Sequence, residues 1–343
     1  MAAPAQQAEA AVQSFWTPER LASARPILPT LSRNPVPRLS LAAPTAGGES
    51  SPGAPPRITG KAALEFATTV PNGGNAEPDD GVTPSMTSSS GYHFTTHRVT
   101  TPQTNGYPYI TTGKLFFHDP KTNGNFVCSA SVIRQRLLST AGHCVYHAGT
   151  TAATKYFYNN FLFVPALNGA VQPFGSWSWA YVVTTATWAN GGGGVPNAAD
   201  VALIETVDKA GVKIWQFTGF LGFFTGGLAP NHLTVLGYPC NLDSCTRMQR
   251  SDAQSFGGSN NTAVLGSAMR GGASGGPWIQ DFGVKPTSSP AVTGLGANYQ
   301  RGNTSYGPIA TEPKYLGASI WDSRWVTIKN LACAHRAGNC TTP

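Results

Sequence analysis

Short apolar runs separated by turn-forming residues dominate the chain from about residue 107 onward. They are rich in Val, Leu, Ile and aromatic side chains, which fit a pleated strand better than a helix. The 39 Gly and 27 Pro residues supply turns between such runs. Typical runs are KLFF (114–117), FLFV (161–164), VALI (201–204) and LTVL (233–236). Regular short strands of this kind predict an all-β sandwich or barrel.

Helical spacing is confined to two places. Near the C-terminus, large apolar residues recur at helical spacing: Trp321, Trp325, Ile328 and Leu331. They predict a helix over about 320–332, with Ser319 as a possible N-cap and Asp322 three residues later. Near the N-terminus, the run Thr-Pro-Glu predicts a short helix near 17–25, which Pro26 ends.

Composition and charge exclude two classes of partner. The formal net charge is +7, but Lys and Arg are scattered singly and form no basic run, so we expect no nucleic-acid binding. The most apolar stretch, 217–229, is shorter than a bilayer-spanning helix and contains four glycines, so we expect no membrane insertion.

Six cysteines occur as three close pairs, none with Cys-x-x-Cys spacing, and no Cys/His cluster has zinc-ligand spacing. We therefore expect disulfides formed in an oxidising compartment, and no metal or cofactor. Sequence proximity favours the pairs Cys128 with Cys144, Cys240 with Cys245, and Cys333 with Cys340. The first residues have neither a basic region nor an apolar core, so we expect a secreted protein whose export signal has been removed.

Three segments supply the parts that acyl transfer requires: a nucleophile, a base that activates it and a group that orients the base. His143 lies in STAGHC (139–144), and Asp200 precedes the apolar strand 201–204. Ser274 lies in the glycine-rich run RGGASGGPW (270–278), whose backbone can turn sharply. We expect the N–H groups of Gly272 and Ser274 to form an oxyanion hole.

These motifs, in the order His, Asp, Ser, resemble the signature regions of the chymotrypsin/trypsin superfamily. GKLFF (113–117) and TVLGYP (234–239) are similar to the bacterial glutamyl-endopeptidase (V8-like) branch. The resemblance implies a serine endopeptidase acting on polypeptides, with two six-stranded antiparallel β-barrels and a C-terminal helix. The catalytic domain would span 101–343, with barrels at about 107–210 and 225–320. We expect a monomer.

Residues 1–100 have a different composition from the rest. From residue 26 to 90 they are rich in Pro, Ala, Gly, Ser and Thr without periodicity, so we expect this region to be largely disordered. Either a tail or a pro-segment would fit, and we favour a pro-segment because a secreted protease must stay inactive before export. Ala273 stands where trypsin-like zymogens carry an acid, so removal of the segment should act by clearing the cleft.

The motif register predicts the primary pocket residues: Ala268, Met269, Arg270, Gly296, Ala297, Asn298 and Tyr299. None is acidic, so a buried Lys or Arg side chain of a substrate would lack a partner. Gly296 stands where the V8-like branch places a histidine that receives glutamate. We therefore expect a small or medium uncharged residue on the acyl side of the cut bond. Glu/Asp specificity is the alternative, because the Arg270 guanidinium could pair with an acidic side chain of the substrate.

Two other functions fit parts of the sequence. Ser274 also lies in a Gly-x-Ser-x-Gly run, and Ser274, Asp322 and His335 follow the order of an α/β-hydrolase esterase or lipase. That fold needs crossover helices, for which helical pattern is scarce. A non-catalytic trypsin-like binding protein is the second alternative, although such proteins usually lack a triad member and none is missing here.

Overall fold

The computed structural model describes residues 1–5, 8–31, 48–58, 68–69, 92–228, 231–257, 262–285, 296–308 and 314–341. Six strands of these residues close into a first antiparallel barrel in the order β14-β12-β7-β8-β9-β16, with β16 paired back to β14. They are β7 (Thr112–Asp119), β8 (Gly124–Val132), β9 (Leu137–Thr140), β12 (Asn159–Pro165), β14 (Trp177–Thr184) and β16 (Ala202–Thr206).

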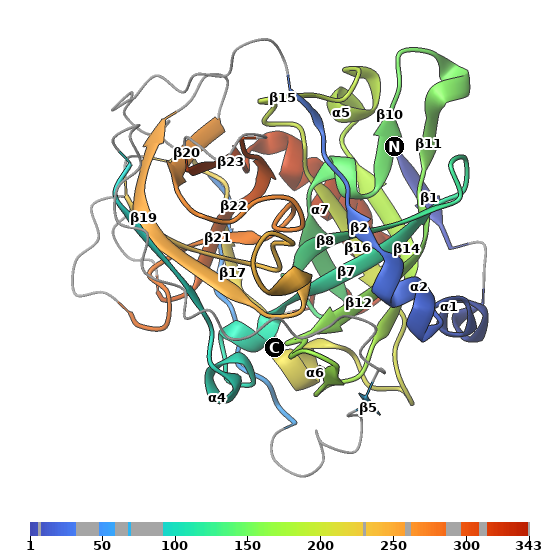
Figure 1. Cartoon of the computed structure of the whole chain (residues 1–343), viewed down its shortest axis with the longest axis horizontal. Coiled ribbons are helices and arrows are strands. Elements are labelled where there is room, and N and C mark those ends of the chain that lie inside the picture. Colours follow the sequence, from blue (N-terminus) through green and yellow to red (C-terminus); the bar gives the residue numbers. More distant parts are fainter. Residues whose placement is uncertain are drawn as a thin grey trace.

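A second barrel of six described strands lies beside the first (Figure 1). Its order is β21-β18-β19-β20-β23-β22, and β22 pairs back to β21. The strands are β18 (His232–Gly237), β19 (Gln249–Gly257), β20 (Thr262–Gly266), β21 (Pro277–Gln280), β22 (Tyr299–Tyr306) and β23 (Tyr315–Ile320). The predicted pair of six-stranded antiparallel barrels is therefore confirmed.

Strand β7 illustrates how the core forms. Phe117 is fully buried, and its ring lies 5.1 Å from that of Tyr158 and 6.0 Å from that of Phe161. Phe116, on the opposite face of the strand, is also buried and lies 5.6 Å from the ring of Trp16. All eight residues of β7 are buried. Phe15 and Trp16 of the N-terminal part of the chain contact His118 and Phe116 of this strand.

The N-terminal part of the chain packs mainly on the first barrel. Its elements are β1 (Ala2–Pro4), α1 (Glu9–Phe15), α2 (Pro18–Ser23), β2 (Arg25–Pro26) and β3 (Thr30–Leu31). The predicted short helix is present as α2, with the Thr17 hydroxyl accepting from Arg20 N at 3.4 Å. The strands and α1 were not predicted. The remainder of the expected pro-segment at 32–47, 59–67 and 70–91 lies outside the described residues.

The two strands β2 and β3 run parallel to their partners. β2 pairs with Phe126 and Val127 of β8, and β3 pairs with β15 (Gly194–Val195). Figure 1 shows this stretch, in blue, running over the first barrel toward β15. Residues 25–31 therefore pass from β8 to the loop that precedes Asp200.

Helix α7 (Ser323–His335) follows the second barrel and packs on β14 and β16 of the first. Its N-cap is Asp322, whose carboxylate accepts from Arg324 N at 2.9 Å. The prediction of Ser319 as the N-cap was wrong: Ser319 belongs to β23 and donates to Asn197 O at 2.7 Å. Asp322 has an extended backbone, with φ −137° and ψ −163°, so the helix begins only at Ser323. The stacked rings of Trp321 and Trp325 lie 4.2 Å apart across this junction.

The other described elements are short. The strands are β4 (Ser50–Ser51), β5 (Thr68–Thr69), β6 (Phe94–Arg98), β10 (Tyr146–Ala148), β11 (Lys155–Phe157), β13 (Val171–Gln172) and β17 (Gly222–Phe224). The helices are α4 (Thr101–Thr104), α5 (Ala186–Asn190), α6 (Trp215–Thr218) and the 3-10 turns Tyr109–Thr111, Gly142–Cys144, Ala152–Thr154 and Asp243–Cys245. Among the described helices, none has the length and apolarity to cross a bilayer.

Candidate active site

His143 follows β9 in a single 3-10 turn that a disulfide holds to β8. The bond joins Cys128 on β8 to Cys144, the residue after His143. The bonds between Cys240 and Cys245 and between Cys333 and Cys340 are also present, so the three predicted pairings are confirmed. The turn is tight: a Cβ on Gly142 would lie 2.9 Å from Trp188 and 3.1 Å from an Asp200 carboxylate oxygen.

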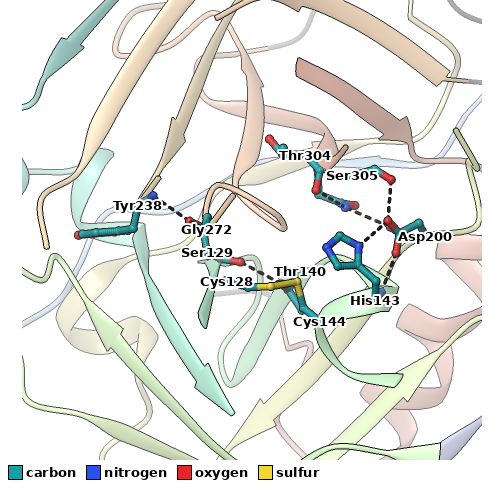
Figure 2. The surroundings of a disulfide bond; sticks show 11 residues. Cys128, Ser129, Thr140, His143, Cys144, Asp200, Tyr238, Gly272, Thr304 and Ser305 are labelled. Atoms are coloured by element: carbon teal, nitrogen blue, oxygen red, sulfur yellow. Dashed lines mark hydrogen bonds and ion pairs between the residues drawn. A yellow bond between two sulfur atoms is a disulfide. The ribbon is translucent and has the colours of Figure 1, made fainter. Parts of the chain in front are cut away.

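The Asp200 carboxylate holds His143 in one orientation (Figure 2). It is fully buried, and its Oδ1 accepts from His143 N at 2.7 Å. His143 Nδ1 lies 2.8 Å from Oδ2, and because a carboxylate only accepts, Nδ1 carries the proton. The neutral ring then has Nε2 as an acceptor. Among the described residues, Nε2 is buried and has no hydrogen-bond partner.

Two residues that the sequence did not predict complete the surroundings of Asp200. The Ser305 hydroxyl donates to Oδ2 at 2.6 Å, and Asn303 Nδ2 donates to the Asp200 carbonyl oxygen at 3.1 Å. Both lie on β22 in the second barrel, about a hundred residues further along the chain. No sequence motif marks them, because their role depends on how the two barrels pack.

Ser274 lies in the tight loop before β21 and is 6% exposed. Two glycines allow this loop. Gly272 has φ +98°, and a Cβ there would lie 2.5 Å from Tyr238 O; Gly275 has φ +82°, and its Cβ would lie 2.1 Å from Thr140 Oγ1. A larger residue at Gly275 would push the loop away from Thr140 and Ser129 of the first barrel, and one at Gly272 would clash with Tyr238 and Cys240, which follow β18 of the second barrel.

The N–H groups of Gly272 and Ser274 have no hydrogen-bond acceptor among the described residues. The carbonyl on the other side of each peptide is held: Gly271 O accepts from Cys240 N at 2.7 Å, and Ala273 O accepts from Gly276 N at 2.9 Å. Because N–H and C=O point in opposite directions across a trans peptide, each N–H points away from these partners. Both donors remain available to an oxygen at the nucleophile.

Two cavities lie at the proposed catalytic residues. One, of about 360 Å³, contains Ser274 and Arg270 in its wall; the other, of about 460 Å³, contains His143. Leu28 and Pro29 line both cavities, so the N-terminal segment passes between them. No hydrogen bond joins Ser274 to His143 in the described residues.

Of the predicted pocket residues, only Arg270 lines the cavity at Ser274. Met269 is fully buried in the core of the second barrel, and Ala268 accepts from Asn241 Nδ2 through its carbonyl oxygen. Gly296, Ala297, Asn298 and Tyr299 lie elsewhere: Asn298 N donates to Asp281 O at 3.0 Å, and Tyr299 pairs with Gln280.

The pairing register explains this displacement. β22 runs antiparallel to β21, whose first residue, Pro277, lies close to Ser274 and pairs with Asn303. The start of β22 therefore lies far from the nucleophile and its end lies near it. The described residues from this part of the chain that line the cavity are Thr304, Tyr306, Gly307 and Pro308, together with Leu316.

One group of potential metal ligands lies close together in the described part of the chain: Cys128, His143 and Cys144. The two cysteines are bonded to each other, and a disulfide sulfur lacks the thiolate charge that binds zinc. This group does not fit a metal site.

No protein-family model matches the chain. A curated relative, the "Extracellular metalloprotease" of Bacillus subtilis (strain 168), is 26% identical over 153 residues, which are 43% of this chain and 44% of the relative. The chain therefore matches less than half the length of that protein.

Solved serine protease structures match over most of the described fold. A thermostable serine protease, AL20, from an extremophilic microorganism has 25% identity and a TM-score of 0.56, covering 66% of this chain and 98% of that one. Protease Anisep from Arthrobacter nicotinovorans has 23% identity, a TM-score of 0.54 and coverages of 66% and 96%. A Glu endopeptidase has 18% identity, a TM-score of 0.53 and coverages of 70% and 96%. The chain thus has the double β-barrel fold of the trypsin-like serine proteases, which excludes the α/β-hydrolase alternative.

Proposed function

We propose that this chain is a serine endopeptidase with Ser274 as nucleophile, His143 as base and Asp200 as the residue that orients the base. One observation carries the proposal: His143 is fixed by Asp200 through Nδ1 while Nε2 remains unpaired among the described residues. His143 and Ser274 line two neighbouring cavities that share Leu28 and Pro29. The likeness to structures described as serine proteases supports the same reaction.

The reaction follows from these groups. His143 Nε2 takes the proton of the Ser274 hydroxyl as Oγ bonds to the substrate carbonyl carbon. The carbonyl oxygen becomes an oxyanion that accepts from Gly272 N and Ser274 N. The C–N bond then breaks, and His143 gives the proton to the leaving amine. Water repeats the sequence on the acyl-enzyme, releases the acid and restores Ser274.

The segment at residues 26–31 supports a zymogen. Leu28 and Pro29 occupy the cleft between Ser274 and His143, so a polypeptide cannot bind there until the segment leaves. Ala273 is fully buried and carries no acid that a new N-terminal ammonium could pair with. Removal of the segment would activate the enzyme by opening the cleft.

For specificity, we propose an uncharged residue of small or medium size on the acyl side of the cut bond. Among the described residues, the cavity at Ser274 contains apolar walls, such as Leu316 and Pro308, and no acid. A Lys or Arg side chain would lack a partner there. Arg270 keeps the Glu/Asp alternative open to test: a preference for acidic residues that is lost in Arg270→Ala would favour it.

Secretion is supported by the three disulfides, which form in oxidising compartments, and by the extracellular relative. A monomer remains our proposal, and size-exclusion chromatography of the full chain tests it.

The deciding experiment is peptide-library cleavage and fluorophosphonate labelling of the protein after its N-terminal segment has been removed from the folded chain. Ser274→Ala should lose labelling completely and lose kcat on the order of 10⁴-fold or more, with an unchanged circular dichroism spectrum. Ser255→Ala, a buried serine on β19, serves as the matched control and should retain activity. Equal activity of both variants would overturn the mechanism, and an inactive wild type would favour the non-catalytic alternative.

A further inference from the structure

Ser129 belongs to β8 of the first barrel, yet it contacts the loop that carries Ser274 in the second barrel (Figure 2). Its N–H donates to Ser274 O at 2.7 Å, and its hydroxyl donates to Gly272 O at 2.8 Å. These two acceptors lie on either side of Ala273. One residue therefore holds the nucleophile loop at both ends of its tightest part.

The other polar atoms of Ser129 fix its own position. The hydroxyl oxygen accepts from Tyr238 N at 2.9 Å, so the hydroxyl has a fixed donor direction and a fixed acceptor direction. Its carbonyl oxygen accepts from Thr140 Oγ1 at 2.9 Å, three residues before His143. Ser129 is fully buried and follows Cys128, whose disulfide reaches the turn of His143. The same backbone thus supports both the base and the nucleophile.

The contact matters because Gly272 has no Cβ to restrict it. With φ at +98°, Gly272 can rotate at low energetic cost, and a rotation would turn its N–H away from the substrate oxygen. The peptide before Gly272 is held through Gly271 O by Cys240 N. The peptide after it is held through Gly272 O by the Ser129 hydroxyl and through Ala273 N, which donates to Arg270 O at 3.0 Å.

We propose that the Ser129 hydroxyl is a positioning group for the oxyanion hole: it keeps the Gly272 N–H aimed at the oxygen that becomes negative in the transition state. The inference rests on the acyl transfer proposed above. Ser129 itself touches no substrate atom, since its hydroxyl donates to Gly272 O and accepts from Tyr238 N. Its contribution appears in the transition state, where the oxyanion hydrogen bonds are strongest, and only weakly in substrate binding.

The test compares Ser129→Ala with Ser131→Ala. Ser131 is also a fully buried serine on β8, but its hydroxyl donates to Gln300 Oε1 at 2.8 Å, away from the nucleophile loop. Both are prepared as full chains, from which the N-terminal segment is removed after folding. For Ser129→Ala we expect kcat to fall about 10- to 100-fold with KM changed less than about threefold, and for Ser131→Ala little change in either.

A transition-state analogue gives an independent measurement. A peptide boronic acid forms an adduct with Ser274 that places an oxygen in the oxyanion hole, so its inhibition constant should rise by the factor by which kcat/KM falls. If the role of Ser129 were purely structural, Ser129→Ala would lower thermal stability, but the inhibition constant would not rise in proportion to the loss of kcat/KM. Equal kinetics of Ser129→Ala and Ser131→Ala would overturn the inference.

A second pair of variants tests the inference in case Ser129→Ala folds poorly. Ser129→Thr and Ser129→Val have the same shape and differ only in the hydroxyl, so both meet the same steric limits. We expect the Thr variant to have a kcat about tenfold or more above that of the Val variant. Equal kcat values would also overturn the inference. An inactive wild type, in contrast, would show that the proposed function itself fails.

Discussion

The Asp200 carboxylate accepts three hydrogen bonds, from His143 N, His143 Nδ1 and Ser305 Oγ, so both oxygens are used. Asp200→Asn replaces one acceptor by an amide that donates, which favours the wrong tautomer of His143. We expect kcat to fall about 10⁴-fold with the fold retained. Ser305→Ala removes one bond only and should cost far less. Steady-state kinetics measures the loss of kcat in each variant, and similar losses in Asp200→Asn and Ser305→Ala would contradict the role given to Asp200.

A buried amine makes stability depend on pH. Burial lowers the pKa of Lys114 from 10.5 to about 7, and its Nζ lies 4.6 Å from the Phe116 ring. In the unfolded chain the amine keeps its proton up to about pH 10, so between about pH 7 and pH 10 the unfolded chain binds one more proton. The contribution of Lys114 to the free energy of unfolding therefore rises with pH across this window.

Lys114→Met removes this dependence. We expect the variant to be more stable than the wild type at about pH 7 by on the order of 1 kcal/mol or more, with the difference shrinking toward about pH 10. Urea unfolding of the full chain at both pH values measures it. Lys121→Met, at an exposed position, is the control and should show no such trend. A difference that is independent of pH would contradict the assignment to Lys114.

At the scale of elements, α1 is followed by Trp16, which anchors the N-terminal segment to the first barrel. Trp16 is 6% exposed and donates through Nε1 to Asn160 O at 2.6 Å. Trp16→Ala should weaken this docking by about 3 kcal/mol, since it deletes a large buried side chain. If residues 26–31 block the cleft, the full-length variant should react with fluorophosphonate faster than the wild type. Val171→Ala, outside the segment, should react at the wild-type rate.

Some of these elements could be predicted from sequence and others could not. The runs around His143, Asp200 and Ser274 are local motifs, so each side chain could be assigned before any contact was known. Ser129, Asn303 and Ser305 act across the gap between barrels, and their roles depend on strand pairing that no local pattern reveals. The register of β22 is such a case: it places Thr304 and Tyr306, rather than residues 296–299, in the wall of the cavity at Ser274. Helix α1 has only seven residues and is held by packing, which propensity does not describe.

At the scale of the whole molecule, activation should not depend on the exact position of the new N-terminus. Ala273 is buried in the core of the second barrel, where a trypsin-like zymogen would form an ion pair with that terminus. We expect mature forms that differ by one N-terminal residue to have kcat/KM values within about threefold of each other. Forms cut at engineered sites measure this, and an inactive longer form would contradict it.

If removal of residues 26–31 activates the enzyme, their passage between the two cavities also predicts the time course of activation. A molecule whose own cleft is filled cannot cut its own segment, so the first cut must come from another, already open molecule. Each opened molecule then cuts others, and activity in a purified sample should rise sigmoidally after a lag. The lag should shorten as protein concentration increases and vanish when a trace of active enzyme is added at the start. A lag that is independent of concentration would mean that the segment opens and is cut within a single molecule.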